Sequence, residues 1–199
     1  MPVHSPSIGL AGTVGSGKSL AVEILRELGA VAIWADRIGH ALLLEAEVQA
    51  DVTALLGDSV LAPGGGLDRK RIGEVVFSAP ARREGYDKII HPRLLARLRE
   101  NLEALADEQR VVVVEAALIP EWGIEDWFDE VWCIRCSDAR ALARWKRDPE
   151  LYWKIRKAQF APERKSAKAT RVIENERSQE EFRRRIEIEF EQFQRGHGG

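Results

Sequence analysis

A glycine-rich segment early in the chain has the residue types that bind nucleotide phosphates. It fits the pattern Gly-x-x-x-x-Gly-Lys-Ser/Thr, between a strand-like run and a helical one. Its glycines allow a tight turn with inward-pointing N–H groups, and the following helix adds its N-terminal donors. We expect Lys18 to reach the β- and γ-phosphates and the Ser19 hydroxyl to bind Mg²⁺. The expected nucleotide contacts are Gly12, Thr13, Val14, Gly15, Ser16, Gly17, Lys18, Ser19 and Leu20.

Short apolar runs alternate with longer helical patterns, which predicts an α/β fold with a parallel sheet. Strands are expected at residues 7–11, 30–34, 111–116, 131–135 and 171–174. The apolar spacing predicts a helix from Lys18 to Leu28 that Gly29 ends. Pro92 is predicted to begin a helix that runs to about residue 106. A capping box at Ser178 and Glu181 predicts the last helix. The expected buried faces are Leu20, Ile24, Leu25 and Leu28 in the first helix and Phe182, Ile186, Phe190 and Phe193 in the last.

Two mostly helical excursions interrupt the simple alternation of strands and helices. The first covers residues 37–108 and includes a turn at 63–66, and the second covers 138–170. The second is basic: residues 135–171 carry a net charge of +8, so the rest of the chain carries −10. A basic segment on an acidic body suits a small polyanionic ligand, although a solvated helical face has the same composition.

Ligands of parallel sheets bind beyond the carboxyl ends of the strands, and this rule selects further candidates. Asp36 follows the second strand and could accept the proton of an attacking hydroxyl, or cap a helix. Glu115 ends the third strand and could hold Mg²⁺, or be a buried carboxylate satisfied by backbone donors. Arg144, Arg147 and Arg164 could clamp a transferring phosphoryl group, although each alone is typical of a protein surface.

Other residues give weaker signals. A lone histidine such as His91 is more often structural than catalytic. Cys133 and Cys136 form a Cys-x-x-Cys without the second pair of ligands that zinc needs. Five of the six tryptophans fall between residues 122 and 153, where core packing is the default role.

Composition excludes several protein classes. The chain has 199 residues, of which 45% are apolar, as in one soluble domain with an inserted subdomain. Its 30 basic and 32 acidic residues exclude a polybasic nucleic-acid-binding chain. Two cysteines cannot form a disulfide framework. Because the sequence has no long apolar stretch and no secretory pattern, we expect a cytoplasmic protein that binds neither membranes nor nucleic acids.

An ordered set of motifs over most of the chain resembles the dephospho-coenzyme A kinase family. The phosphate loop resembles that of the family, and Asp36 falls on the second aspartate of its Asp-Ala-Asp motif. The other matches are Gly66, Leu67, Asp68, Arg69 and Phe77; His91 and Pro92; Leu118, Ile119 and Glu121; Arg144, Trp145, Lys146, Arg147 and Asp148; and Gln159, Arg164, Val172, Ile173, Glu174 and Asn175.

The resemblance implies a P-loop core with a five-stranded parallel sheet, formed by residues 1–36, 109–137 and 171–199. It implies a helical coenzyme-A-binding domain at 37–108 and a lid at 138–170. The implied reaction transfers the γ-phosphate of ATP, with Mg²⁺, to the ribose 3′-hydroxyl of dephospho-coenzyme A. Asp36 would be the base, and Lys18 and Arg147 would contact phosphates. Arg144 and Asn175 would bind the nucleotide, and Arg69, His91 and Arg164 the substrate.

Several positions depart from the family pattern. Trp34 replaces the first aspartate of Asp-Ala-Asp, and Thr13 replaces a second loop glycine. Leu20, Ala117 and Thr170 replace a threonine, a proline and an aspartate, respectively. The departures leave two alternatives open: a different small-molecule kinase on the same core, or a nucleotide-binding protein without activity. The sequence does not determine the oligomeric state.

Overall fold

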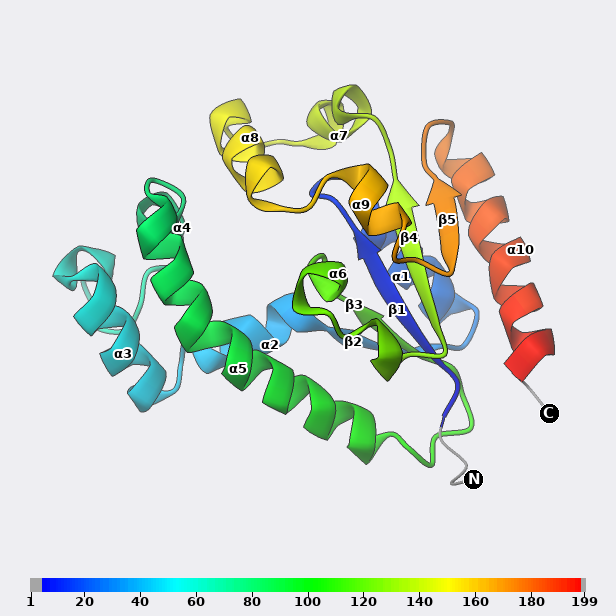
Figure 1. Cartoon of the computed structure of the whole chain (residues 1–199), viewed down its shortest axis with the longest axis horizontal. Coiled ribbons are helices and arrows are strands. Elements are labelled where there is room, and N and C mark those ends of the chain that lie inside the picture. Colours follow the sequence, from blue (N-terminus) through cyan, green and yellow to red (C-terminus); the bar gives the residue numbers. More distant parts are fainter. Residues whose placement is uncertain (1–4, 198–199) are drawn as a thin grey trace. The chain divides into compact units, whose positions relative to one another are not determined.

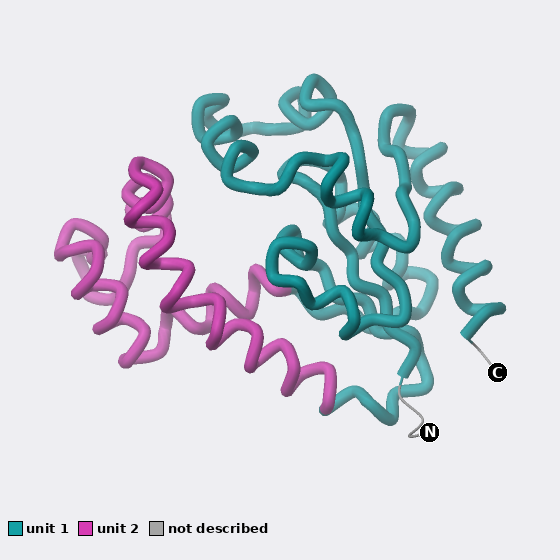
Figure 2. The backbone as a smooth tube through the Cα atoms, viewed as in Figure 1, with its two compact units in different colours: residues 1–34, 104–199 teal, residues 35–103 magenta. Residues whose placement is uncertain are grey.

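The core of the protein is a parallel sheet of five strands. The computed structural model describes residues 5–197 and divides into two compact units (Figures 1 and 2). Unit 1 comprises residues 1–34 and 104–199, and unit 2 comprises residues 35–103. The strands are β1 (Ser7–Gly12), β2 (Val31–Trp34), β3 (Val112–Glu115), β4 (Glu130–Arg135) and β5 (Arg171–Glu174). Each expected strand is present, with bounds that differ by one residue or none, which confirms the α/β fold.

The strands lie in the order β2-β3-β1-β4-β5 and all run parallel. Leu10 of β1 is level with Glu115 of β3 and with Trp132 of β4. Because β1 lies at the centre, the segment that follows it emerges between the carboxyl ends of its neighbours. This is the topological switch point at which open α/β sheets bind their ligands.

Two helices of unit 1, α1 (Lys18–Glu27) and α10 (Gln179–His197), pack side by side on one face of the sheet (Figure 1). Their apolar faces meet Ile8, Trp132 and Ile173 in one buried cluster. The predicted capping box is confirmed, since Ser178 and Glu181 exchange hydrogen bonds at the start of α10. The predicted face of α10 is confirmed as well: Phe182, Ile186, Phe190 and Phe193 are all buried.

The predicted buried face of α1 is partly wrong. Ile24 and Leu25 are fully buried, but Leu28 is exposed and Leu20 is half-buried. Ala21 and Val22 are buried instead, because α1 is covered by the sheet on one side and by α10 on another. Gly29 follows the helix with φ of +99°, so the predicted glycine stop is confirmed.

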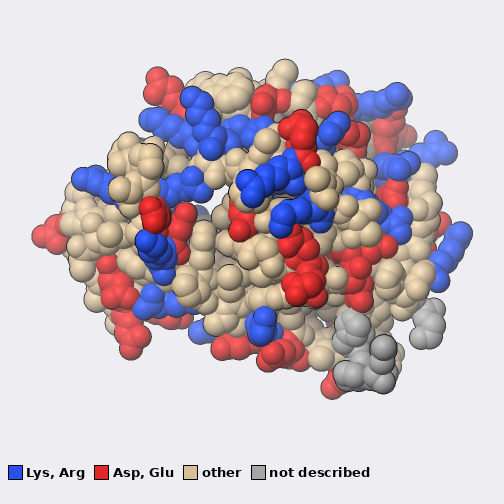
Figure 3. Space-filling model, viewed as in Figure 1, with Lys and Arg blue, Asp and Glu red and all other residues tan. Residues whose placement is uncertain are grey.

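Short helices of unit 1 lie beyond the carboxyl ends of the strands. They are α6 (Ile119–Trp122) and the 3₁₀ turn η2 (Glu125–Trp127) after β3, and α7 (Asp138–Arg144), α8 (Pro149–Ala158) and α9 (Pro162–Ser166) between β4 and β5. The contacts of α9 with β1 and β4 and of α6 with β1 place these helices against the strands that flank the loop after β1. Lys and Arg side chains are frequent over α8 and α9 (Figure 3).

A cluster of charged side chains lies at the amino ends of β4 and β5. The Arg171 guanidinium donates to both carboxylate oxygens of Glu130, at 2.5 and 2.9 Å, and to Glu189 on α10 at 2.7 Å. Trp132 Nε1 also donates to Glu130. Glu130 and Glu189 are buried. We call Glu130, Arg171 and Glu189 the amino-edge ion cluster.

Unit 2 is helical. It contains α2 (Ala35–Leu42), α3 (Ala46–Leu56), the 3₁₀ turn η1 (Asp58–Val60), α4 (Arg69–Val76) and α5 (Pro80–Ala104). The predicted turn at 63–66 is present, since Ala62 N–H donates to the Gly66 carbonyl. Asp68 caps α4 by accepting from the N–H groups of Lys70 and Arg71.

The prediction that Pro92 begins a helix is wrong, because Pro92 lies inside α5. Pro92 is exposed, while Ile90, Leu94 and Leu98 form one buried stripe that continues past it. A proline removes one hydrogen bond of its helix, and here packing on both sides of the proline outweighs that loss. The Arg93 side chain also donates to the Ile89 carbonyl, within the same turn.

Among residues 5–197, the structure contains no helix that is long and apolar enough to cross a membrane.

Candidate active site

The phosphate loop joins β1 to α1 at the centre of the sheet. Gly17, the last loop residue, has φ of +105°, a conformation that residues with a side chain rarely adopt. A Cβ atom there would lie 2.2 Å from Asn175 Nδ2. Gly12 is equally constrained, because a Cβ atom would lie 2.5 Å from the Ile134 carbonyl oxygen. The glycine pattern therefore reflects both backbone conformation and close packing.

Side chains from outside the loop hold its backbone. Gln159, which follows α8, accepts a hydrogen bond from the Val14 N–H at 2.9 Å. Asn175, which follows β5, donates to the Ser16 carbonyl at 2.8 Å. The first N–H groups of α1 have no partner within the helix, as at any helix N-terminus, and attract anions.

Lys18, the first residue of α1, is buried and folds back over the loop. Its Nζ donates to the Thr13 carbonyl at 3.0 Å. The ammonium group is thus held beside the loop backbone, where a nucleotide's phosphates would compete for it. Ser16 Oγ is fully buried and, among the residues that the structure describes, has no hydrogen-bond partner. The Leu20 side chain is half-buried and packs against the apolar cluster shared by the sheet, α1 and α10.

The two predicted metal ligands lie at the same edge of the sheet. Ser19 is exposed in the first turn of α1, and Glu115 is half-buried at the end of β3. No group of three or more His, Cys, Asp and Glu side chains suited to a metal occurs in residues 5–197. Mg²⁺ in phosphoryl-transfer sites needs only one or two protein oxygens, with phosphate and water oxygens completing its shell. A hydroxyl and a carboxylate match that requirement.

Two predicted nucleotide-binding residues, Arg144 and Asn175, are brought together. Arg144, at the end of α7, donates to both the side-chain oxygen and the carbonyl of Asn175 at 3.1 Å. Asn175 is buried, and its amide nitrogen contacts the phosphate loop as described. The structure therefore links the basic segment to the loop through hydrogen bonds.

The other predicted lid arginines are exposed and stack on aromatic rings. Arg147 lies 5.6 Å from the Trp145 ring centre, and Arg164 lies 3.4 Å from that of Phe160. Within the same segment, the Asp138 carboxylate accepts from Tyr152 Oη and Arg156 Nε at 2.7 and 3.0 Å, which ties α7 to α8.

Asp36, the predicted base, is exposed in the first turn of α2. The helix begins at Ala35, so Asp36 lies inside the helix and is not its cap. Trp34 lies two positions before Asp36, where the family has the first aspartate of its motif. Its side chain packs on the apolar cluster, with Arg26 above its ring. That departure therefore has a packing role.

Thr170 also has a structural role. Its hydroxyl accepts from the Val131 N–H at 3.0 Å, and its own N–H donates to the Val131 carbonyl. These bonds join the amino ends of β4 and β5, at the edge of the sheet opposite to the phosphate loop.

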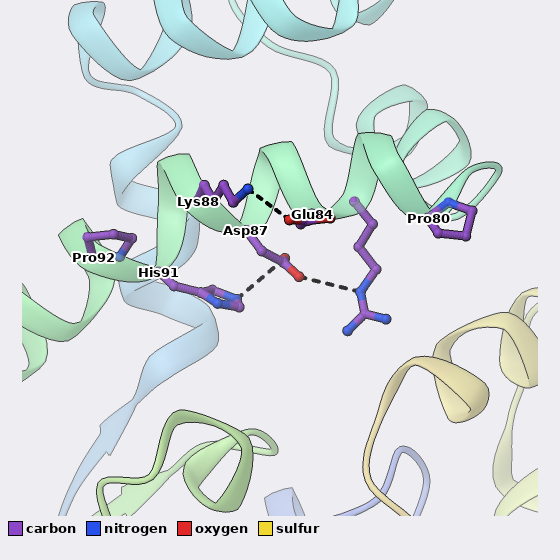
Figure 4. Close-up of a pocket in the computed structure, with 7 residues that line it drawn as sticks. Pro80, Glu84, Asp87, Lys88, His91 and Pro92 are labelled. Carbon is purple, nitrogen blue, oxygen red and sulfur yellow. Dashed lines mark ion pairs between the residues drawn. The ribbon is translucent and has the colours of Figure 1, made fainter.

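In unit 2, a pocket of about 410 Å³ lies along the first half of α5 (Figure 4). His91 and Asp87 turn toward one another there, with Nε2 and Oδ1 3.4 Å apart. Burial lowers the pKa of His91 and raises the pKa of Asp87. Arg69 is exposed at the start of α4, and its charge acts on His40 and Tyr86. Burial raises the pKa of Tyr86 to about 12. The predicted substrate residue His91 thus lines a pocket.

Cys133 and Cys136 are both buried free thiols, and burial raises the pKa of each. Ser166 Oγ donates a hydrogen bond to Cys133 Sγ, and Cys136 Sγ donates one to the Gly15 carbonyl.

A buried ion pair near the loop joins Glu121 to Lys165, which no sequence pattern indicated. Lys165 of α9 lies 2.6 and 2.7 Å from the carboxylate oxygens of Glu121 on α6. Lys165 stands within a run of basic residues, so no local signal distinguishes it from its exposed neighbours. Glu121 is one of the residues that match the family motifs, and it follows shortly after the carboxyl end of a central strand.

The family model described as "Dephospho-CoA kinase" matches residues 7–181 of the chain. The chain belongs to the dephospho-CoA kinase family. A dephospho-CoA kinase of Symbiobacterium thermophilum is 35% identical, with 96% of this chain and 83% of that protein covered. A dephospho-CoA kinase of Geobacter sulfurreducens is also 35% identical, with 90% of this chain and 94% of that protein covered.

A solved dephospho-CoA kinase of Campylobacter jejuni has the same fold. Its TM-score is 0.66 at 25% identity, with 95% of this chain and 97% of that chain covered. The match to dephospho-CoA kinases extends over both units, so it includes the phosphate loop and the helical insertion alike.

Proposed function

We propose that the protein transfers the γ-phosphate of ATP to the ribose 3′-hydroxyl of dephospho-coenzyme A. The observation that carries the proposal is an intact phosphate loop in a chain of the dephospho-CoA kinase family. In the reaction, the bond between the γ-phosphorus and its bridging oxygen breaks. A new bond forms between the phosphorus and the 3′-oxygen, and ADP and coenzyme A leave.

The phosphate loop supplies binding and electrostatics. Loop N–H groups and the N-terminus of α1 face the phosphates, and Lys18 leaves the Thr13 carbonyl for phosphate oxygens. Arg147 adds positive charge from the 138–170 segment, which acts as the lid, and Arg144 with Asn175 orients the nucleotide. Ser19 and Glu115 would hold Mg²⁺, which neutralises phosphate charge when bound.

Unit 2 supplies the acceptor side. Residues 37–108 form the domain that binds dephospho-coenzyme A, with Arg69, His91 and, from the lid, Arg164 as contacts. Asp36 takes the proton of the attacking hydroxyl and passes it to solvent. A positioned general base contributes about 10²–10⁴ in rate.

The test is ADP release measured with and without acceptor. Dephospho-coenzyme A should stimulate release in the presence of ATP and Mg²⁺. Asp36→Asn should lower the stimulated rate about 100-fold or more, while ATP still binds. Asp51→Asn on α3 is a matched control and should keep the wild-type rate. Stimulation only by a different hydroxyl compound would identify another kinase. ATP binding without turnover on any acceptor would contradict a catalytic role.

A further inference from the structure

The junction between α8 and α9 contacts the phosphate loop and α6 through consecutive residues. Gln159 Oε1 accepts from the Val14 N–H of the loop at 2.9 Å. The N–H of the next residue, Phe160, donates to Glu121 Oε1 at 2.8 Å. Two adjacent residues within the basic segment thus contact two other elements of unit 1, the phosphate loop and α6.

The Glu121 acceptor is itself fixed by Lys165. The Lys165 side chain is fully buried, and Nζ donates to both Glu121 oxygens and to the Ala117 carbonyl at 2.5 Å. Burial lowers the pKa of Lys165, whereas hydrogen bonding to Glu121 opposes that shift. A buried pair of this kind is often no more stabilising than apolar packing, so stability alone does not account for it.

The bond to Val14 holds the first half of the loop. The second half is held by Asn175, which donates to the Ser16 carbonyl and lies so close to Gly17 that a Cβ atom there would clash with it. Val14 is half-buried, so without Gln159 its N–H would lose its partner at a site with restricted access to water.

We propose that Gln159 is a positioning residue for ATP. Resting on the proposed function of the loop, the inference is that Gln159 fixes the loop in its phosphate-binding conformation through Val14. The Glu121–Lys165 pair holds the junction from which Gln159 reaches the loop. Nucleotide affinity therefore depends on a side chain that need not touch the nucleotide.

The experiment compares Gln159→Met with the wild-type chain. Methionine keeps the length of the side chain but has no strong acceptor. The dissociation constant of ATP, measured by calorimetry without acceptor, should rise about tenfold, the effect of one lost hydrogen bond. The KM for dephospho-coenzyme A should stay within about twofold of wild type. Gln194→Met on α10 is a matched control and should change neither constant.

A second pair of variants tests the support from α6. Glu121→Gln keeps an acceptor for Phe160 and Lys165 and should bind ATP within about threefold of wild type. Glu121→Leu combined with Lys165→Met removes the acceptor without leaving a buried charge, and should reproduce the ATP defect of Gln159→Met. Wild-type ATP affinity in this double variant would overturn the role of the pair.

The proposal is overturned if Gln159→Met binds ATP like wild type. It is also overturned if ATP affinity, the KM of the acceptor and the free energy of unfolding deteriorate together, as for a purely structural residue. Because ATP binding is measured without acceptor, these outcomes are separate from a failure of wild-type protein to phosphorylate dephospho-coenzyme A.

Discussion

The two edges of the same five-stranded sheet use polar side chains in opposite ways. At the amino edge, the Arg171 guanidinium forms ion pairs with the Glu130 and Glu189 carboxylates. The charged groups of the amino-edge ion cluster therefore contact one another. At the carboxyl edge, Gln159 and Asn175 bond the backbone of the phosphate loop and keep it in place.

This difference between the two edges assigns them different roles: the amino edge contributes to stability, and the carboxyl edge to ATP binding. A neutral acceptor such as Gln159 occupies one loop N–H group, that of Val14, but adds no negative charge beside the phosphates, whereas a carboxylate there would repel them. We therefore expect changes at the carboxyl edge to affect ATP affinity first, and changes at the amino edge to affect the free energy of unfolding first.

Gly17→Ala should have the largest effect. The new Cβ atom would meet Asn175 Nδ2 at a backbone conformation that alanine avoids. Because a displacement of about 1 Å costs on the order of 10² in rate, kcat/KM for ATP should fall about 100-fold or more. The measurement is steady-state kinetics together with urea unfolding. Gly73→Ala on α4, where a Cβ atom meets nothing within 4 Å, is the control and should keep wild-type kinetics.

Arg171→Met should lower the free energy of unfolding by about 3 kcal/mol, because buried Glu130 loses its ion pair and buried Glu189 keeps only that with Arg185. At a temperature at which the variant is folded, its ATP affinity should equal that of wild type. Arg177→Met, which removes an exposed arginine paired with Glu181, should cost less than about 0.5 kcal/mol. A large loss of ATP affinity in folded Arg171→Met would erase the distinction between the edges.

Glu130→Gln should give a loss of stability that depends on pH. Burial would raise the pKa of Glu130, but hydrogen bonds from Arg171 and Trp132 lower it below the usual 4.5. The stabilisation by ionised Glu130 is therefore complete above pH 4.5 and is lost as the pH falls through the lowered value. Urea unfolding of wild type and variant should differ most near pH 7 and converge in acid. A difference that grows in acid would contradict this assignment.

Thr170→Val should have the smallest effect, about 1 kcal/mol of unfolding free energy, since the Val131 N–H loses its acceptor. Thr170→Asp, which restores the family residue, should keep most of that stability because a carboxylate also accepts. Neither variant should change the rate of ADP release. A changed rate in either would indicate that this departure from the family pattern affects function.

Much of the fold could be predicted from the sequence because its signals are local. Buried parallel strands such as β3 are nearly continuous apolar runs, and the phosphate loop combines glycines with a lysine at fixed spacing. The capping box of α10 is a local signal as well. The helix start predicted at Pro92 is wrong because the packing of Ile90 and Leu94 continues the helix past the proline.

The contacts that complete the candidate site could not be predicted in the same way. Gln159 and Val14 are 145 positions apart, and Lys165 and Glu121 are 44 apart. Nothing in the neighbourhood of Gln159 indicates that its side chain reaches a loop at the other end of the chain. Such pairs are defined by strand order, which a list of local elements does not contain.

Transfer of phosphate to one particular hydroxyl is tested most directly by identifying the product. Wild-type protein would be incubated with ATP, Mg²⁺ and dephospho-coenzyme A, and the products followed by ³¹P nuclear magnetic resonance. We expect ADP and a new phosphomonoester on the ribose 3′-oxygen, in equal amounts. Formation of ADP with inorganic phosphate alone, or a phosphate on any other oxygen of the acceptor, would contradict transfer to the 3′-hydroxyl.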